Sequence, residues 1–197
     1  MSKLETNTID TISGSTNLTL GGTNATDITI PSGVTITNNG TQSGFGGTNT
    51  PAFEAYLSSS VSINDNTYTK IQFNTEVYDT DNCYDNSTNY RFTPTVAGKY
   101  YVYSYVAMDS TAGNMRQIST RIYKNGSQGG GTFANINFDD GNGEGGAQFN
   151  HSVIDFNGSS DYVEIFANPD TVDNGTAGVN GDSGERLTVF GAYKLIT

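Results

Sequence analysis

The most regular hydrophobic pattern in the chain lies between Tyr90 and Met108. A short apolar stretch around Phe92 is followed by a turn from Pro94 to Gly98, and then by about ten residues rich in Tyr and Val. Both residue types favour strands, and successive residues of a strand point to opposite faces. The stretch therefore predicts a long strand with two distinct faces. These faces are Tyr100, Val102, Ser104 and Val106 on one side, and Tyr101, Tyr103, Tyr105 and Ala107 on the other.

Shorter alternating runs extend from residue 51 to the end of the chain and predict an all-β domain. Turn signals separate the runs, the strongest being Asn125-Gly126, a dipeptide typical of hairpins. Helical periodicity is not convincing anywhere in this region, so eight to ten antiparallel strands in about 145 residues indicate a two-sheet sandwich or jelly roll. The expected strands cover residues 52–57, 67–73, 90–108, 116–123, 132–138, 147–156, 161–167 and 186–196.

Residues 1–50 have a different pattern, in which apolar-Thr-apolar triplets alternate with turns. The triplets are Leu18–Leu20, Ile28–Ile30 and Val34–Ile36. Strands this short cannot bury a face alone, so they indicate either stacked rungs of a β-solenoid or a stalk wound from several chains. A disordered polar leader is the alternative, because Asn, Thr, Gly and Ser dominate the segment. We therefore expect a stalk or attachment segment over residues 1–50 and a jelly-roll head over residues 51–197.

Composition and charge narrow the classes of partner. The chain has 24 Gly, 12 Tyr and 10 Phe, which opposes helix and supplies aromatic core side chains. Its formal charge of −11, with nine Lys and Arg, would repel a nucleic-acid backbone. A single cysteine cannot form an internal disulfide, and no apolar run predicts an export signal or a membrane span. We expect no nucleic-acid partner and no membrane insertion.

Several short motifs follow one another from residue 51 to the C-terminus. They are Ala52-Phe53-Glu54-Ala55-Tyr56, Phe73-Asn74-Thr75, Asp79, Tyr84-Asp85, the run from Tyr90 to Val102, and Phe190-Gly191-Ala192-Tyr193-Lys194-Leu195-Ile196. Their order and spacing resemble the globular head of the first complement component, a jelly roll shared with the tumour necrosis factor (TNF) superfamily. Two features depart from the usual pattern. The stretch between Tyr84 and Phe92 carries one residue more than usual, and Val102 and Ser104 stand where the family usually has aromatic residues.

The resemblance implies a tight trimer. Family members place one sheet of each jelly roll against the threefold axis, and that sheet contains the strand after the Gly-x-Tyr motif. An exposed row of tyrosines would also form an apolar patch of the kind that marks an interface. The implied interface residues are Tyr101, Tyr103, Tyr105 and Ala107. The implied core residues are Phe53, Phe73, Phe92, Tyr100, Val102 and Val106.

Candidate sites for chemistry are few. The carboxylates of Asp79, Asp81 and Asp85 are close enough in sequence to hold calcium, although the loop lacks the full spacing of a known calcium loop and a solvated acidic loop is the preferred interpretation. We expect no other cofactor. The glycine-rich stretch 141–146 precedes a strand rather than a helix, so it does not predict a nucleotide site. His151 and Cys83 lack a catalytic setting, which indicates that the chain is not an enzyme.

The combination of this head with a Thr-, Asn- and Gly-rich leader resembles bacteriophage fibres and virion surface proteins. It implies a structural virion protein (a fibre, decoration or adhesion protein) made in the host cytoplasm and exposed on the particle. Residues 1–50 would attach to other virion proteins, and the loops 79–88, 135–146 and 169–184 would contact a host surface glycan or protein. The alternatives are a surface-glycan depolymerase on the same kind of fibre and a structural knob without a ligand.

Overall fold

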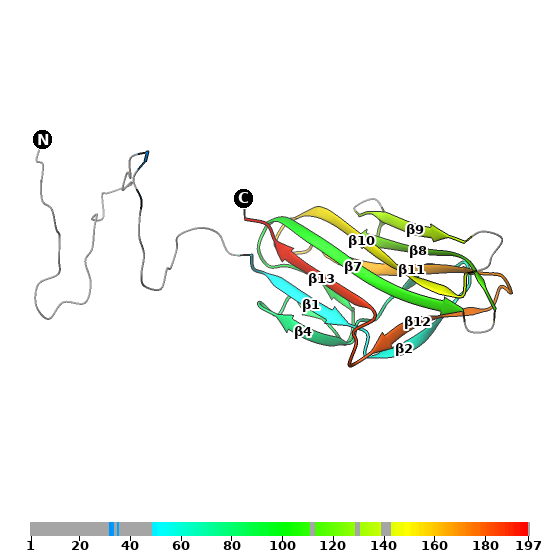
Figure 1. Ribbon diagram of the computed structural model, residues 1–197. Helices are drawn as coiled ribbons and strands as arrows, with labels where there is room; N and C mark the ends of the chain where they lie inside the picture. Colours follow the sequence, from blue (N-terminus) through cyan, green and yellow to red (C-terminus); the bar gives the residue numbers. More distant parts are fainter. Residues whose placement is uncertain are drawn as a thin grey trace, which may run out of the picture. The chain divides into compact units, whose positions relative to one another are not determined.

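The computed structural model describes residues 32–33, 35, 49–110, 113–128, 131–138 and 143–196. These residues form antiparallel strands in two sheets and contain no α-helix, which confirms the predicted all-β class (Figure 1). The predicted stalk lies almost entirely outside them. The strands are β1 (Ala52–Tyr56), β2 (Ser59–Asn64), β3 (Thr69–Lys70), β4 (Thr75–Asp79), β5 (Tyr84–Asp85), β6 (Arg91–Phe92), β7 (Gly98–Ser110), β8 (Met115–Lys124), β9 (Phe133–Asn137), β10 (Gly145–Phe156), β11 (Val163–Thr171), β12 (Thr176–Asp182) and β13 (Val189–Lys194).

The first sheet is built around β7, the 13-residue strand that contains the tyrosine row. Its strand order is β2-β12-β7-β13-β1-β4, and β10 also pairs with β7. β10 follows one edge of β7 over nearly its whole length, whereas β13 and β12 share the other edge (Figure 1). The long strand predicted from the alternation of tyrosine and valine is therefore at the centre of a seven-stranded sheet.

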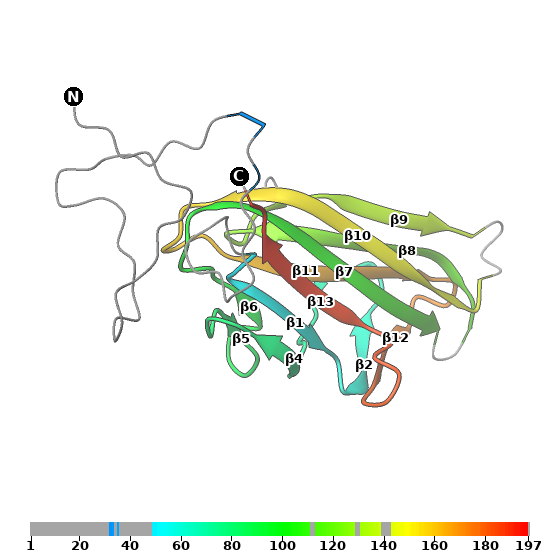
Figure 2. The same ribbon diagram turned by 60° about the vertical axis from the view of Figure 1, so that its left-hand side comes forward.

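The second sheet has the order β5-β6-β11-β8-β9, with β3 also paired to β11, and it lies behind the first (Figure 2). The hairpin predicted at Asn125-Gly126 joins β8 to β9. Both turn residues have positive φ, 53° and 71°, as a type I′ turn requires. Gly at the second position accepts this conformation without steric penalty.

The core between the sheets is an aromatic cluster centred on Phe53. Its ring stacks on Tyr84 and on Phe92, with centroids 4.6 Å away in both cases, and meets Phe190 edge-on at 4.9 Å. Phe53 has no accessible surface, so these contacts are entirely dry. The six side chains expected in the core are all 0% exposed: Phe53, Phe73, Phe92, Tyr100, Val102 and Val106.

Four strands have no counterpart among the expected ones: β2, β4, β5 and β12. β2 buries Ile63 alone, so its side chains carry little alternation that a sequence pattern could detect. It forms because its backbone pairs with β12, which itself fills the edge of β7 beyond the end of β13. The expected strand 67–73 shrinks to β3, because this segment pairs with β11 at two positions only.

Candidate functional site

The outward-pointing side chains of the first sheet form a continuous surface, which we call the aromatic face. The register places Phe149 of β10 and Val189 of β13 on either side of Tyr105, and Val153 and Tyr193 on either side of Tyr101. The face thus combines strands that are far apart in sequence. Its members are Tyr56, Tyr78, Tyr101, Tyr103, Tyr105, Ala107, Phe149, His151, Val153, Val189 and Tyr193.

Much of the aromatic face is open to solvent. Val153 is 54% exposed, Phe149 50% and Tyr105 41%. The ring of Tyr101 lies between His151, at 5.6 Å, and Tyr193, at 5.5 Å, so neighbouring rings already support one another. A contiguous apolar surface of this kind ordinarily marks a contact site.

The four residues expected at the trimer interface lie on this face. Tyr105 is exposed, while Tyr101, Tyr103 and Ala107 are half-buried by their neighbours within the same chain. The alternation of β7 was sufficient to group them. That Phe149, Val153 and Tyr193 join them could not be predicted from the sequence, because it depends on the cross-strand register.

Tyr103 is fixed across the sheet by a hydrogen bond. Its hydroxyl donates to Glu54 Oε2 at 2.7 Å, and Arg186 Nη1 lies 3.7 Å from the other carboxylate oxygen. The ring passes directly over Gly191, where a Cβ atom would come within 2.4 Å of it. Burial, reinforced by the charge of Glu54, raises the pKa of Tyr103, so the phenol stays neutral and continues to donate.

The predicted calcium ligands each accept hydrogen bonds from within their own loop. Asp79 Oδ2 accepts from the backbone N–H of Tyr84 at 2.7 Å, and the Asp81 carboxylate accepts from its neighbour Thr80. Asp85 accepts from Ser87, Thr88 and Asn89, and their N–H groups hold its pKa well below the usual range. Within the described residues, no group of three His, Cys, Asp or Glu side chains is arranged to hold a metal. The structure therefore does not bring these three carboxylates together as a metal site.

The same loop surrounds an open hollow of about 490 Å³, which we call the polar hollow. It lies beside β4, β5 and β6, and its wall is mostly polar. The lining residues are Glu76, Asn82, Cys83, Tyr84, Asp85, Asn86, Ser87, Asn89, Arg91 and Thr93. This composition suits a small hydrophilic ligand better than an apolar one.

The two residues considered for nucleophilic chemistry lie in different surroundings. His151 is exposed on the aromatic face, where its ring contacts Tyr101 and Phe149. Cys83 is buried in the core cluster, and its thiol lies 3.6 Å from the carbonyl of Asp81 and 3.7 Å from the hydroxyl of Thr95. The strand expected after the stretch 141–146 is present as β10.

No helix in the described part of the chain is long and apolar enough to cross a membrane. No protein-family model matches the sequence, and no curated protein matches it.

Solved structures do match the chain. The globular domain of the zebrafish complement 1qA protein covers 74% of this chain and 97% of its own, with 16% identity and a TM-score of 0.46. The match to the Eiger TNF from S. frugiperda covers 73% of this chain and 91% of the Eiger chain, with 10% identity and a TM-score of 0.50. The match to murine APRIL covers 73% of this chain and 99% of the APRIL chain, with 11% identity and a TM-score of 0.47. The match to the Eiger TNF, together with the two antiparallel sheets described above, shows that the fold is a TNF-like jelly roll.

Proposed function

We propose that the chain forms a homotrimer in which the aromatic faces of three copies pack around a threefold axis. The aromatic face is the observation that carries this proposal. Val153, Phe149 and Tyr105 are each at least 41% exposed in the single chain, although they are among the side chains that gain most from burial. Association of copies would remove this surface from water.

Charge also favours this face as the contact between copies. Each chain carries a formal charge of −11, so copies repel one another unless they meet where charge is scarce or compensated. The carboxylate of Glu54 is satisfied by Tyr103 and Arg186, and Asp155 at the end of β10 pairs with Lys99 at 2.8 Å. The centre of the face is otherwise uncharged, as interface cores usually are.

Within this proposal the trimer is the head of a non-enzymatic structural virion protein, and residues 1–50 attach it to the particle. The head would bind a host surface glycan or protein through its loops. A trimer supports this role because it presents three copies of every loop at once, so weak single contacts combine into stable attachment. The loops are suited to contact because they are internally braced: Asp182, for example, accepts from the N–H groups of Gly184 and Glu185.

The mass of the full chain in solution tests the trimer. Sedimentation equilibrium at micromolar concentration is expected to give three times the chain mass of 21.0 kDa. A mass equal to one chain over the same concentration range would overturn the proposal.

Incubation with the purified surface polysaccharide of a candidate host tests the role of the head. Retention of the polysaccharide without cleavage is expected of an adhesion protein. Shortened products would show a depolymerase instead. If the polysaccharide is neither retained nor cleaved, the head is a structural knob without a ligand.

A further inference from the structure

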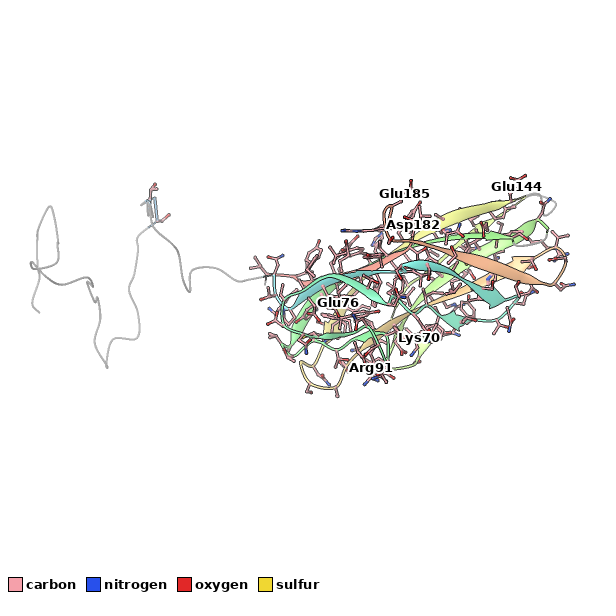
Figure 3. The ribbon with its side chains drawn as sticks, turned by 90° about the horizontal axis from the view of Figure 1, so that it is seen from below. Lys70, Glu76, Arg91, Glu144, Asp182 and Glu185 are labelled. Atoms are coloured by element: carbon pink, nitrogen blue, oxygen red, sulfur yellow. The ribbon has the colours of Figure 1, made fainter. Side chains whose placement is uncertain are left out.

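We propose that the polar hollow binds one neutral sugar unit of a surface glycan. This proposal deepens the adhesive role proposed above and rests on it. It names the ligand class, a neutral saccharide, and places its site on one side of the head. Figure 3 labels Glu76 and Arg91, which come from different strands on this side, whereas Asp182 and Glu185 lie along the opposite edge of the view.

The wall of the hollow is braced by hydrogen bonds. Asp85 accepts five hydrogen bonds from the three residues Ser87, Thr88 and Asn89, which closes the loop on itself. The loop is joined to the core by two further bonds: the Tyr84 hydroxyl donates to the Phe73 carbonyl at 2.9 Å, and a backbone bond links Thr93 to Cys83 at 2.8 Å. A ligand would therefore meet preformed walls, which lowers the entropy lost on binding.

The side chains that face the hollow retain unused hydrogen-bonding capacity. The guanidinium of Arg91 lies 4.3 Å from the ring centre of Tyr162, and it makes no hydrogen bond or ion pair with any described residue. Within the same described ranges, the carboxylate of Glu76 and the amides of Asn82 and Asn86 have no side-chain partner either. Burial and the charge of Asp79 raise the pKa of Glu76, as expected for a carboxylate facing a recess.

Donors and acceptors of this kind match the hydroxyl groups of a sugar. Each hydroxyl both donates and accepts, Arg91 can only donate, Glu76 accepts, and the amides of Asn82 and Asn86 do both. Bonds to the two charged groups would be the stronger ones. The volume of about 490 Å³ lies within the range of small-molecule sites, roughly 300–1,000 Å³.

Other ligand classes fit the hollow less well. A phosphate or an acidic sugar would face the carboxylates of Glu76 and Asp85 on a chain of charge −11. An apolar ligand would leave polar wall groups without partners. A peptide that binds through its side chains ordinarily requires apolar pockets, and the two least polar lining residues, Cys83 and Tyr84, are buried. β4 and β5 each end their sheet, so a peptide probe tests strand addition at these edges.

Saturation-transfer NMR on the full-length protein tests the site. The neutral probes are the methyl glycosides of glucose, galactose, mannose and N-acetylglucosamine. Glucose 6-phosphate and N-acetylneuraminic acid probe negative charge, and a polar hexapeptide of Gly, Ser, Asn and Thr probes a protein partner. We expect saturation to be transferred from the protein to at least one neutral glycoside, and not to the charged sugars or the peptide.

Two variants and a matched control locate the binding. Arg91→Met should weaken the affinity for the bound glycoside at least about tenfold, because it removes a charged donor. Asn86→Ala should weaken it roughly two- to tenfold, the usual effect of losing one neutral hydrogen bond. Asn64→Ala, at an exposed position of β2 on the opposite edge of the first sheet from β4, should leave the affinity unchanged. Circular dichroism checks that each variant is folded. If Arg91→Met does not fold, Asn86→Ala still tests the site.

Three results would overturn the sugar site: no transfer to any neutral glycoside, stronger binding of a charged sugar or the peptide, or equal affinity in all variants. The mass of the protein in solution is measured in parallel. A trimer without glycoside binding would reject this site alone, whereas a monomer would reject the proposed assembly.

Discussion

The contact between Tyr103 and Gly191 is the tightest fit on the aromatic face. The absence of a Cβ atom at Gly191 lets the Tyr103 ring lie flat on β13 and reach Glu54 on the next strand, β1. A glycine within a strand commonly marks such a close approach. The tyrosine row is therefore fitted to its own sheet as well as being open to a partner.

Gly191→Ala should lower the free energy of unfolding by about 1–3 kcal/mol, because the new methyl group must displace the Tyr103 ring. Urea denaturation at one fixed protein concentration measures this change. In a Tyr103→Ala background the same substitution should have a much smaller effect, since the obstacle is gone.

Gly146→Ala is the matched control, because a Cβ atom there would meet its nearest neighbours at an ordinary 3.5 Å. Equal effects of Gly191→Ala with and without Tyr103 would contradict the contact. So would an equally large effect of Gly146→Ala.

At the scale of the element, the loop between β5 and β6 is stabilised by one ionised carboxylate. Hydrogen bonds from Thr88, Ser87 and Asn89 hold the pKa of Asp85 below its unfolded value of about 3.9. A lowered folded pKa means that Asp85 stabilises the fold fully above the unfolded pKa. This contribution is lost as the pH falls through the folded value.

Asp85→Ala should therefore lower the free energy of unfolding by about 1 kcal/mol at neutral pH, a modest figure because the carboxylate is partly solvated. The difference between variant and wild type should be constant from about pH 6 to pH 8 and should shrink below about pH 4. Urea titrations over this range provide the measurement. A difference that grew on acidification would show that the sign of the pKa shift is wrong.

The sequence predicted those elements whose side chains alternate strongly. In β7 the alternation separates Tyr100 and Val102, which have no accessible surface, from the half-buried Tyr101 and Tyr103. β2 and β12 were missed because their pairing depends on backbone bonds between distant segments and on small or polar side chains such as Gly178. Local patterns contain no information about such partners.

The candidate sites could likewise be predicted only in part from the sequence. The interface residues of β7 could be grouped from the sequence alone, because one strand determines which of its side chains share a face. The polar hollow could not be predicted, because Glu76 and Arg91 come together only after β4 and β6 have been placed in different sheets. Ser104 is a further example: its buried hydroxyl has no hydrogen-bond partner among the residues that the structure describes, at a position where the resemblance indicates an aromatic side chain.

At the scale of the whole molecule, the two sides of the first sheet have different roles in the proposed assembly. The inward side packs against the second sheet and contributes Phe53, Tyr100 and Phe190 to the core. The outward side is the aromatic face, and we propose that it is buried by two further copies of the chain. The polar hollow, which borders on β5 and β6 of the second sheet, is lined by residues outside the aromatic face.

The most direct test is a pair of matched charge substitutions compared by sedimentation velocity. Val153 on the aromatic face is 54% exposed, and Val172 outside it is 40% exposed, so Asp at either position should be tolerated by the folded single chain. Val153→Asp would place a like charge from each copy in the contact, and it should convert the trimer to a folded monomer. Val172→Asp should remain a trimer. A trimer that persists in Val153→Asp, or one lost equally in both variants, would contradict assembly through the aromatic face.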